Sequence, residues 1–175
     1  MIHEAIEFAA IKHRNQTRKG TDIPYIVHPM EVMQILTANS CDEKTIVAGI
    51  LHDTLEDTVT THEELSEHFG EDVADIVGGV TEDKSKSWKI RKLHTITTLP
   101  DESFESQLVC CADKVANLKS MLADYEKQGE NLWGRFNAPK SEIAWYYRGV
   151  RDALCSLEDY EMYRELEQLI HVIFD

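Results

Sequence analysis

The segment Thr45-Ile46-Val47-Ala48-Gly49-Ile50-Leu51-His52-Asp53-Thr54-Leu55-Glu56-Asp57 joins an apolar run to a cluster of ionisable side chains. If the segment is helical, Asp53, Glu56 and Asp57 are spaced i, i+3 and i+4, so their carboxylates share one face beside His52. Like charges crowded on one turn destabilise it unless something offsets them. A divalent cation would offset this negative charge.

Two residues elsewhere in the chain are suitable further ligands for such a cation, namely His28 and Asp113. Asp113 interrupts a long apolar helix, where burial of an unpaired carboxylate is costly. Histidine and aspartate donors without a thiolate favour Mn²⁺, Fe²⁺, Mg²⁺ or Zn²⁺ with positions left open for water. The alternative is that the histidines are hydrogen-bonded core residues and the acids are solvated.

Size and composition limit the possible organisation. The chain has 175 residues, of which 42% are hydrophobic, enough for one compact domain without a disulfide. We expect a single domain over residues 1–175 and no second catalytic domain. The N-terminal residues do not have the charged and then apolar pattern of a signal peptide, and no apolar run reaches the roughly 20 residues that span a membrane. We therefore expect a soluble, cytoplasmic protein. Reduced cysteines fit that prediction, because no C-x-x-C spacing occurs among Cys41, Cys110, Cys111 and Cys155.

The net charge of −14 argues against a nucleic-acid partner, because backbone binding requires a basic surface. Two basic clusters stand out against this acidic background, and they are candidate anion sites. The alternative is two solvated helix faces. The clusters comprise Lys12, Arg14, Arg18 and Lys19, then Lys84, Lys86, Lys89, Arg91 and Lys92.

Helical periodicity dominates the sequence, and strand signals are scarce. Asp42 is predicted to cap the helix that leads to His52, and Thr61 with Glu64 has the spacing of a capping box ahead of a stop at Gly70. The fold class predicted is all-α, with one domain of many helices. The expected helices cover residues 2–14, 29–36, 42–52, 61–70, 73–80, 108–122, 137–154 and 157–174.

Four motifs occur in order: Arg18-Lys19-Gly20, Pro24 to Pro29, His52 to Thr58 and Ala112 to Leu118. Together they resemble the HD-domain alarmone hydrolases, that is, the RelA/SpoT hydrolase domain and the small stand-alone alarmone hydrolases. The resemblance is strongest over residues 4–125, and residues 126–175 are expected to form C-terminal helices. It implies an HD-type fold and removal of the 3′-pyrophosphate from ppGpp or pppGpp, leaving GDP or GTP.

The resemblance also implies roles for individual residues. Glu56 and Asp57 would position or deprotonate the attacking water. One divalent metal, Mn²⁺ in this family, would be ligated by His28, His52, Asp53 and Asp113. Because coordination needs neutral imidazole, metal affinity should weaken below about pH 6.5.

Substrate contacts follow from the same resemblance. Arg18 and Lys19 match the nucleotide-contacting pair of the family. Asn117 matches a residue near the ribose or base, and Lys84 lies in a segment that resembles the one facing the pyrophosphate. Tyr146, or its neighbour Tyr147, is expected to stack on the purine, with a core position as the alternative. The remaining histidines have no partner in the motifs and are expected in the core or on the surface: His3, His13, His62, His68, His94 and His171.

Two other functions remain open at this stage. The same metal site would serve a phosphohydrolase of another nucleotide or phosphorylated metabolite, such as NADPH, because HD sites are permissive. A non-catalytic nucleotide sensor is the second alternative, although Glu56 and Asp57 argue against it. We expect a small-molecule nucleotide partner and no membrane partner, and oligomerisation is possible through the acidic C-terminal helix.

Overall fold

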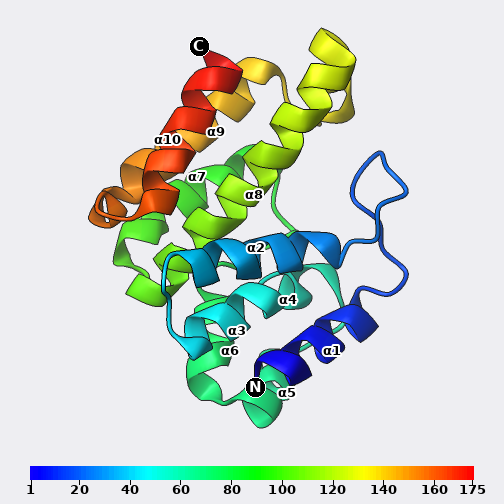
Figure 1. Ribbon diagram of the computed structural model, residues 1–175, viewed down its shortest axis with the longest axis vertical. Helices are drawn as coiled ribbons and strands as arrows, with labels where there is room; N and C mark the ends of the chain where they lie inside the picture. The colour runs from blue at the N-terminus through cyan, green and yellow to red at the C-terminus, as the bar shows by residue number, and fades with distance from the viewer.

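The computed structural model describes residues 1–175 as helices joined by turns and loops (Figure 1). The predicted all-α class is confirmed, since the one pairing of extended residues is an isolated bridge between Thr17 and Pro24. The α-helices are α1 (Ile2–Lys12), α2 (Val27–Ala38), α3 (Glu43–Leu51), α4 (Thr54–Asp57), α5 (His62–Phe69), α6 (Glu71–Gly78), α7 (Trp88–Thr98), α8 (Phe104–Gln128), α9 (Lys140–Ala153) and α10 (Glu161–Phe174), with short 3-10 helices η1 (Leu99–Asp101), η2 (Gly129–Arg135) and η3 (Cys155–Leu157).

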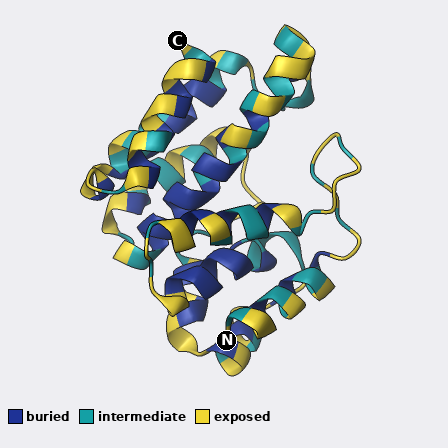
Figure 2. Cartoon of the chain, viewed as in Figure 1, coloured by how far each residue is buried: buried dark blue, intermediate teal, exposed yellow.

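The long helix α8 joins the two ends of the molecule. It packs against α2 and α3 over its first half and against α10 and η2 further along, as Figure 1 shows. At the N-terminal end, helices α1 and α6 pack on α3 and α5 packs on α6, while α7 and α10 pack on α9 at the C-terminal end. Buried positions line the inner faces of these helices (Figure 2), and one continuous cluster of buried residues extends from Ala5 to Ile173.

Helix α3 is buried along its whole apolar run and ends where the ionisable cluster begins. Its predicted cap is confirmed, because a carboxylate oxygen of Asp42 accepts a hydrogen bond from the backbone N of Thr45 at 2.8 Å. Every residue from Thr45 to Leu51 is buried. His52 therefore emerges at the C-terminal end of a helix that is fixed by packing on all sides.

The predicted capping box at α5 forms only in part. The hydroxyl of Thr61 accepts from the backbone N of Glu64 at 3.2 Å, and Gly70, with φ +92°, ends the helix as expected. The carboxylate of Glu64 binds Lys12 Nζ at 2.7 Å instead of turning back to its own helix. Lys12 is consequently part of an ion pair between α1 and α5, which corrects its prediction as an anion site.

The observed helices differ from the predictions in several places. Helix α2 begins at Val27, so Pro29 lies within the first turn, where its missing N–H costs nothing. The last helix begins at Glu161 and not at residue 157. Helix α7 is absent from the predictions. None of its residues is buried, so its sequence shows no clear apolar periodicity.

Gly49 allows α2 and α3 to approach closely. A Cβ atom at this position would overlap the side chain of Leu36, which is fully buried on α2. This close approach brings the start of α2, with His28, towards the end of α3, with His52. No helix of the chain combines the length and the apolar character needed to cross a membrane.

Candidate metal centre

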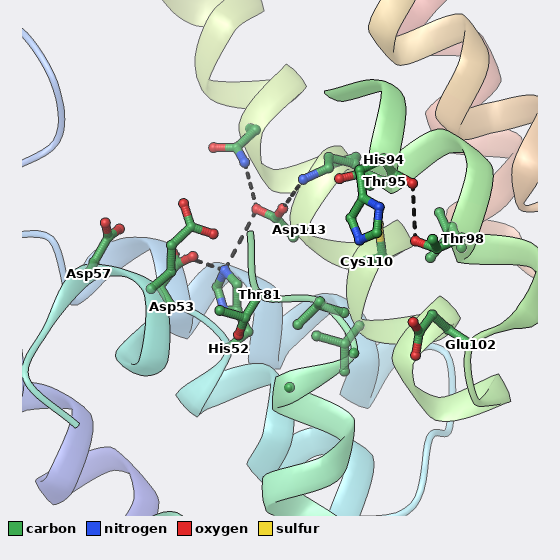
Figure 3. Close-up of a pocket in the computed structure, with 18 of the residues that line it drawn as sticks. His52, Asp53, Asp57, Thr81, His94, Thr95, Thr98, Glu102, Cys110 and Asp113 are labelled. Carbon is green, nitrogen blue, oxygen red and sulfur yellow. Dashed lines mark hydrogen bonds and ion pairs between the residues drawn. The ribbon is translucent and has the colours of Figure 1, made fainter. Parts of the chain in front are cut away.

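Four side chains predicted as metal ligands converge where α2, the end of α3 and α8 meet. His28 Nε2 lies 3.0 Å from Asp113 Oδ1 and 3.6 Å from Asp53 Oδ2. His52 Nε2 lies 3.0 Å from Asp53 Oδ2 and 3.7 Å from Asp113 Oδ1. Figure 3 shows His52, Asp53 and Asp113 directed at one another across the cavity, and the ligand atoms of His28, His52 and Asp113 all lie within 4.8 Å of one another.

The donor atoms suit a divalent cation. His52 Nδ1 lies 2.8 Å from the carbonyl oxygen of Gly49, and because a carbonyl only accepts, Nδ1 carries the hydrogen. In the neutral imidazole Nε2 then holds a lone pair, and this nitrogen lies 3.0 Å from Asp53 Oδ2 and 3.7 Å from Asp113 Oδ1, where a cation would be bound. A histidine ligand oriented through its second nitrogen is the usual arrangement at a metal. The two carboxylates, Asp53 and Asp113, supply the charge that balances a divalent ion.

Protons compete with a cation at this site. Burial opposes the charged imidazolium, yet Asp53 and Asp113 outweigh it and hold the pKa of His52 well above its usual value. The pKa of both carboxyls lies below the ordinary range: burial acts in the opposite direction, but His52 lowers the pKa of Asp53 and Lys114 lowers that of Asp113. Both carboxylates therefore remain ionised and available for coordination at neutral pH.

Glu56 and Asp57 lie at the edge of the same cavity, which has a volume of about 240 Å³ and is also lined by the four ligands. A carboxylate oxygen of Glu56 accepts from the backbone N of Glu82 at 3.1 Å, and burial raises the pKa of Glu56. Asp57 forms an ion pair with Lys84, which also lies 3.6 Å from Glu56. These contacts hold both acids beside the ligand cluster without placing them in it.

Tyr25 is a site residue that the sequence analysis missed. Its hydroxyl donates to Asp53 Oδ2 at 2.5 Å and lies 3.3 Å from Asp57 Oδ2, so it links a ligand to the neighbouring acid. Burial raises the pKa of Tyr25, and the hydroxyl stays protonated as a donor. The available signal was its position three residues before His28, inside a quoted motif.

Cationic side chains form the far wall of this cavity. Lys114, next to the ligand Asp113, places Nζ 2.5 Å from Asp113 Oδ2. Lys92 also lines the cavity, and it shares the carboxylate of Glu82 with Arg91, at 2.7 and 2.8 Å. The second basic cluster is therefore divided: Lys92 lies on this wall, Lys84 pairs with Asp57 at the edge of the cavity, and Lys89 pairs with Glu142 on the surface. His94, for which the sequence offered no partner, lines the cavity as well.

A second cavity of about 310 Å³ adjoins the first, and Tyr25 and Asn117 line both. Arg18 and Lys19, the predicted nucleotide-contacting pair, lie on its wall. Arg18 donates to Asn117 Oδ1 at 2.8 Å, and Asn117 Nδ2 donates to Asp113 Oδ1 at 2.5 Å. Asn117 thus connects the ligand cluster to the basic residues of the second cavity.

The structure places Tyr146 differently from the prediction. Tyr146 is buried and lines neither cavity, with Lys92 and Lys114 lying over its ring at 4.6 and 5.6 Å. Its neighbour Tyr147 lines the second cavity. Successive residues of α9 point about 100° apart around the helix, which is why adjacent tyrosines differ. Of these two tyrosines, Tyr147 is therefore the one at the cavity wall.

These helices and this ligand cluster define an HD-type metal-binding domain, and the chain belongs to the HD domain family, which it matches over residues 5–140. Within that family it is 46% identical over 124 residues to the guanosine-3′,5′-bis(diphosphate) 3′-pyrophosphohydrolase MESH1 of Danio rerio, covering 69% of each chain. A guanosine-3′,5′-bis(diphosphate) 3′-pyrophosphohydrolase of Aquifex aeolicus is 40% identical over 75% of this chain and 19% of its own. The resemblance to RelA/SpoT-type hydrolase domains is confirmed.

Solved structures give the same family relationship. One, described as a metazoan ortholog of SpoT that hydrolyzes ppGpp, superposes with a TM-score of 0.82 at 28% identity, covering 98% of this chain and 94% of the other. A second, lmo0812 from Listeria monocytogenes, superposes with a TM-score of 0.78 at 33% identity, covering 84% of this chain and 98% of the other. The HD-type fold therefore extends beyond the motif region into the C-terminal helices.

Proposed function

We propose that this chain is a metal-dependent hydrolase that removes the 3′-pyrophosphate from ppGpp or pppGpp, leaving GDP or GTP. One observation carries the proposal: the four predicted ligands and the acids Glu56 and Asp57 line one cavity, and a second cavity lined by Arg18 and Lys19 adjoins it at Tyr25 and Asn117. A nucleotide with a diphosphate fits this division, because its phosphates need the cation and its nucleoside needs the adjoining space. Similar chains at 40 and 46% identity bear the name of this activity.

The geometry suggests a division of labour among the residues. A bound cation supplies positive charge against the phosphoryl oxygens and lowers the pKa of a water molecule. Glu56, whose pKa is raised by burial, accepts a proton from the attacking water. Asp57, held by Lys84 and Tyr25, orients that water.

Binding of the substrate falls to the cationic and polar residues of the two cavities. Lys92 and Lys114 offset the charge of the pyrophosphate group at the metal end. Arg18 and Lys19 bind the nucleotide in the second cavity, and Asn117, which lines both cavities, contacts the ribose. The cationic groups suit a highly charged substrate on a protein with a net charge of −14.

The cation proposed is Mn²⁺, held by His28, His52, Asp53 and Asp113. Two imidazoles and two carboxylates form a mixed nitrogen and oxygen donor set that suits Mn²⁺. A structural zinc site usually contains thiolate ligands, and this donor set contains none. We also propose that residues 1–175 act as one domain in the cytoplasm, which agrees with the continuous core and the four free cysteines.

The test is to incubate the Mn²⁺-loaded protein with ppGpp and measure pyrophosphate and GDP. We expect equimolar release of both, and no release from a loaded site would overturn the proposal. A parallel panel of NADPH, nucleoside monophosphates and other phosphate esters tests the broader phosphohydrolase. Tight ppGpp binding without turnover would instead identify a sensor.

A further inference from the structure

The second cavity contains an acid that the proposed chemistry does not use. Asp124 lies on its wall together with the cations Arg18 and Lys19. A carboxylate repels phosphate groups, so its presence marks a part of the cavity that receives a different part of the ligand. An ionised carboxylate only accepts hydrogen bonds, and its partner must therefore carry N–H or O–H donors.

Helix α8 places Asp124 at a fixed distance from the metal ligands. Asp113, Asn117 and Asp124 are spaced i, i+4 and i+11, which puts all three on one face of the helix. With a rise of 1.5 Å per residue, the Cα atoms of Asp113 and Asp124 lie roughly 16 Å apart. A nucleotide that has its 3′-pyrophosphate at Asp113 and its ribose at Asn117 therefore directs its base towards Asp124.

Arg135, at the end of η2, holds the carboxylate in place. Its Nη1 lies 2.5 Å from Asp124 Oδ2, and both side chains are largely buried, with 18% of each exposed. Gly20, with φ +75°, leaves the space in which Arg135 lies, since a Cβ atom there would be 3.0 Å from Arg135 Nε. The ion pair occupies Oδ2, and no protein group donates to Oδ1.

Purine bases differ in the pattern that faces such a carboxylate. Guanine presents two adjacent donors, N1–H and the N2 amino group, and a carboxylate accepts both. Adenine presents the acceptor N1 beside its N6 amino group. The lone pair of N1 would then face a carboxylate oxygen, and two acceptors repel each other. A site built to pair with donors discriminates strongly against an analogue that lacks one.

We propose that Asp124 is the specificity residue that selects guanine over adenine nucleotides, and that Arg135 is its positioning residue. The proposal rests on the proposed function, because it needs a nucleotide lying across both cavities. Neither residue belongs to the four motifs that carry the resemblance, so the motifs assign no role to Asp124 or Arg135.

The experiment measures GDP and ADP binding to the Mn²⁺-loaded protein by calorimetry, which needs no turnover. The wild-type protein should bind GDP at least tenfold more tightly than ADP, as expected for a hydrogen bond to a charged group. Asp124→Asn presents one donor and one acceptor, a pattern that suits adenine, and should reduce the GDP/ADP ratio at least tenfold. Glu165→Gln, which removes a different ion pair of α8 with Lys119, should leave the ratio unchanged.

The outcomes separate selection from a structural role. An unchanged GDP/ADP ratio in Asp124→Asn, or equal weakening of both nucleotides with a lower Tm, would overturn the proposal. If the variant does not fold, IDP binding to the wild-type protein decides, because IDP lacks the N2 amino group: binding as tight as that of GDP would overturn it. Guanine preference without pyrophosphate release would contradict the proposed function alone.

Discussion

His28 Nε2, on α2, lies 3.0 Å from Asp113 Oδ1, on α8, although the two residues are far apart in the sequence. The contact exists because α2 and α8 pack on one another and on α3, burying Val32 and Leu36 of α2 in the shared core. The geometry of the candidate metal centre is therefore a product of helix packing, and changes in that packing should alter it.

Metal affinity should fall as the pH is lowered, beginning above pH 6.5. The carboxylates raise the pKa of His52 above that ordinary value in the metal-free protein, so the proton remains bound at higher pH and must be displaced by the cation. The same proton stabilises the metal-free fold at low pH, and this contribution is lost as the pH rises through the raised pKa. Calorimetry with Mn²⁺ between pH 6 and 9 measures the trend, and an affinity independent of pH would contradict histidine ligation.

Glu56→Gln should preserve metal binding and reduce the rate of hydrolysis about 10² to 10⁴-fold, because the amide cannot accept the proton from water. Glu56 touches no ligand, so the Mn²⁺ stoichiometry should remain that of the wild type. Pyrophosphate release from ppGpp measures the rate. Glu63→Gln, at an exposed position on α5, is the matched control and should keep full activity. Loss of metal together with activity would place Glu56 among the ligands.

Tyr25→Phe should lower the affinity for Mn²⁺ about 10 to 100-fold, the usual effect of losing a hydrogen bond to a metal ligand. The variant removes the donor to Asp53 Oδ2 and keeps the ring that packs beside His28. Competition with a fluorescent chelator gives the affinity. An unchanged value would show that Asp53 is oriented without the hydroxyl.

Gly49→Ala should destabilise the fold by up to about 2 kcal/mol. Overpacking against the buried side chain of Leu36 costs about 1 to 3 kcal/mol, and the higher helix propensity of alanine returns about 1 kcal/mol. Gly134→Ala, where a Cβ atom meets nothing within 4 Å, is the control. Urea denaturation of both variants tests the expectation, and equal stability of the two would mean that α2 and α3 separate without cost.

The sequence allowed the prediction of most helices and of four side chains that meet in the structure, for physical reasons. The helix from Asp42 to His52 has a side-chain cap and a fully apolar run, which are local signals. Asp113 stands out as a carboxylate in an apolar helix, and His28 stands out through its motif. Their convergence, however, depends on packing between helices, which no local pattern specifies.

Other features could not be predicted from local patterns. Helix α7 lacks buried residues, so its periodicity is weak. The choice between Tyr146 and Tyr147 depends on the rotation of α9 about its axis, and this rotation is set by contacts with α7 and α10. The pair of Asp124 and Arg135 forms only after η2 folds back on α8, which is a tertiary event.

The central claim is that one divalent ion lies among His28, His52, Asp53 and Asp113. Crystals grown with Mn²⁺ and measured at the manganese absorption edge test it most directly. We expect one strong anomalous peak within bonding distance of all four side chains, with Glu56 and Asp57 outside that distance. A peak elsewhere, or no peak in a protein that still hydrolyses ppGpp, would contradict it.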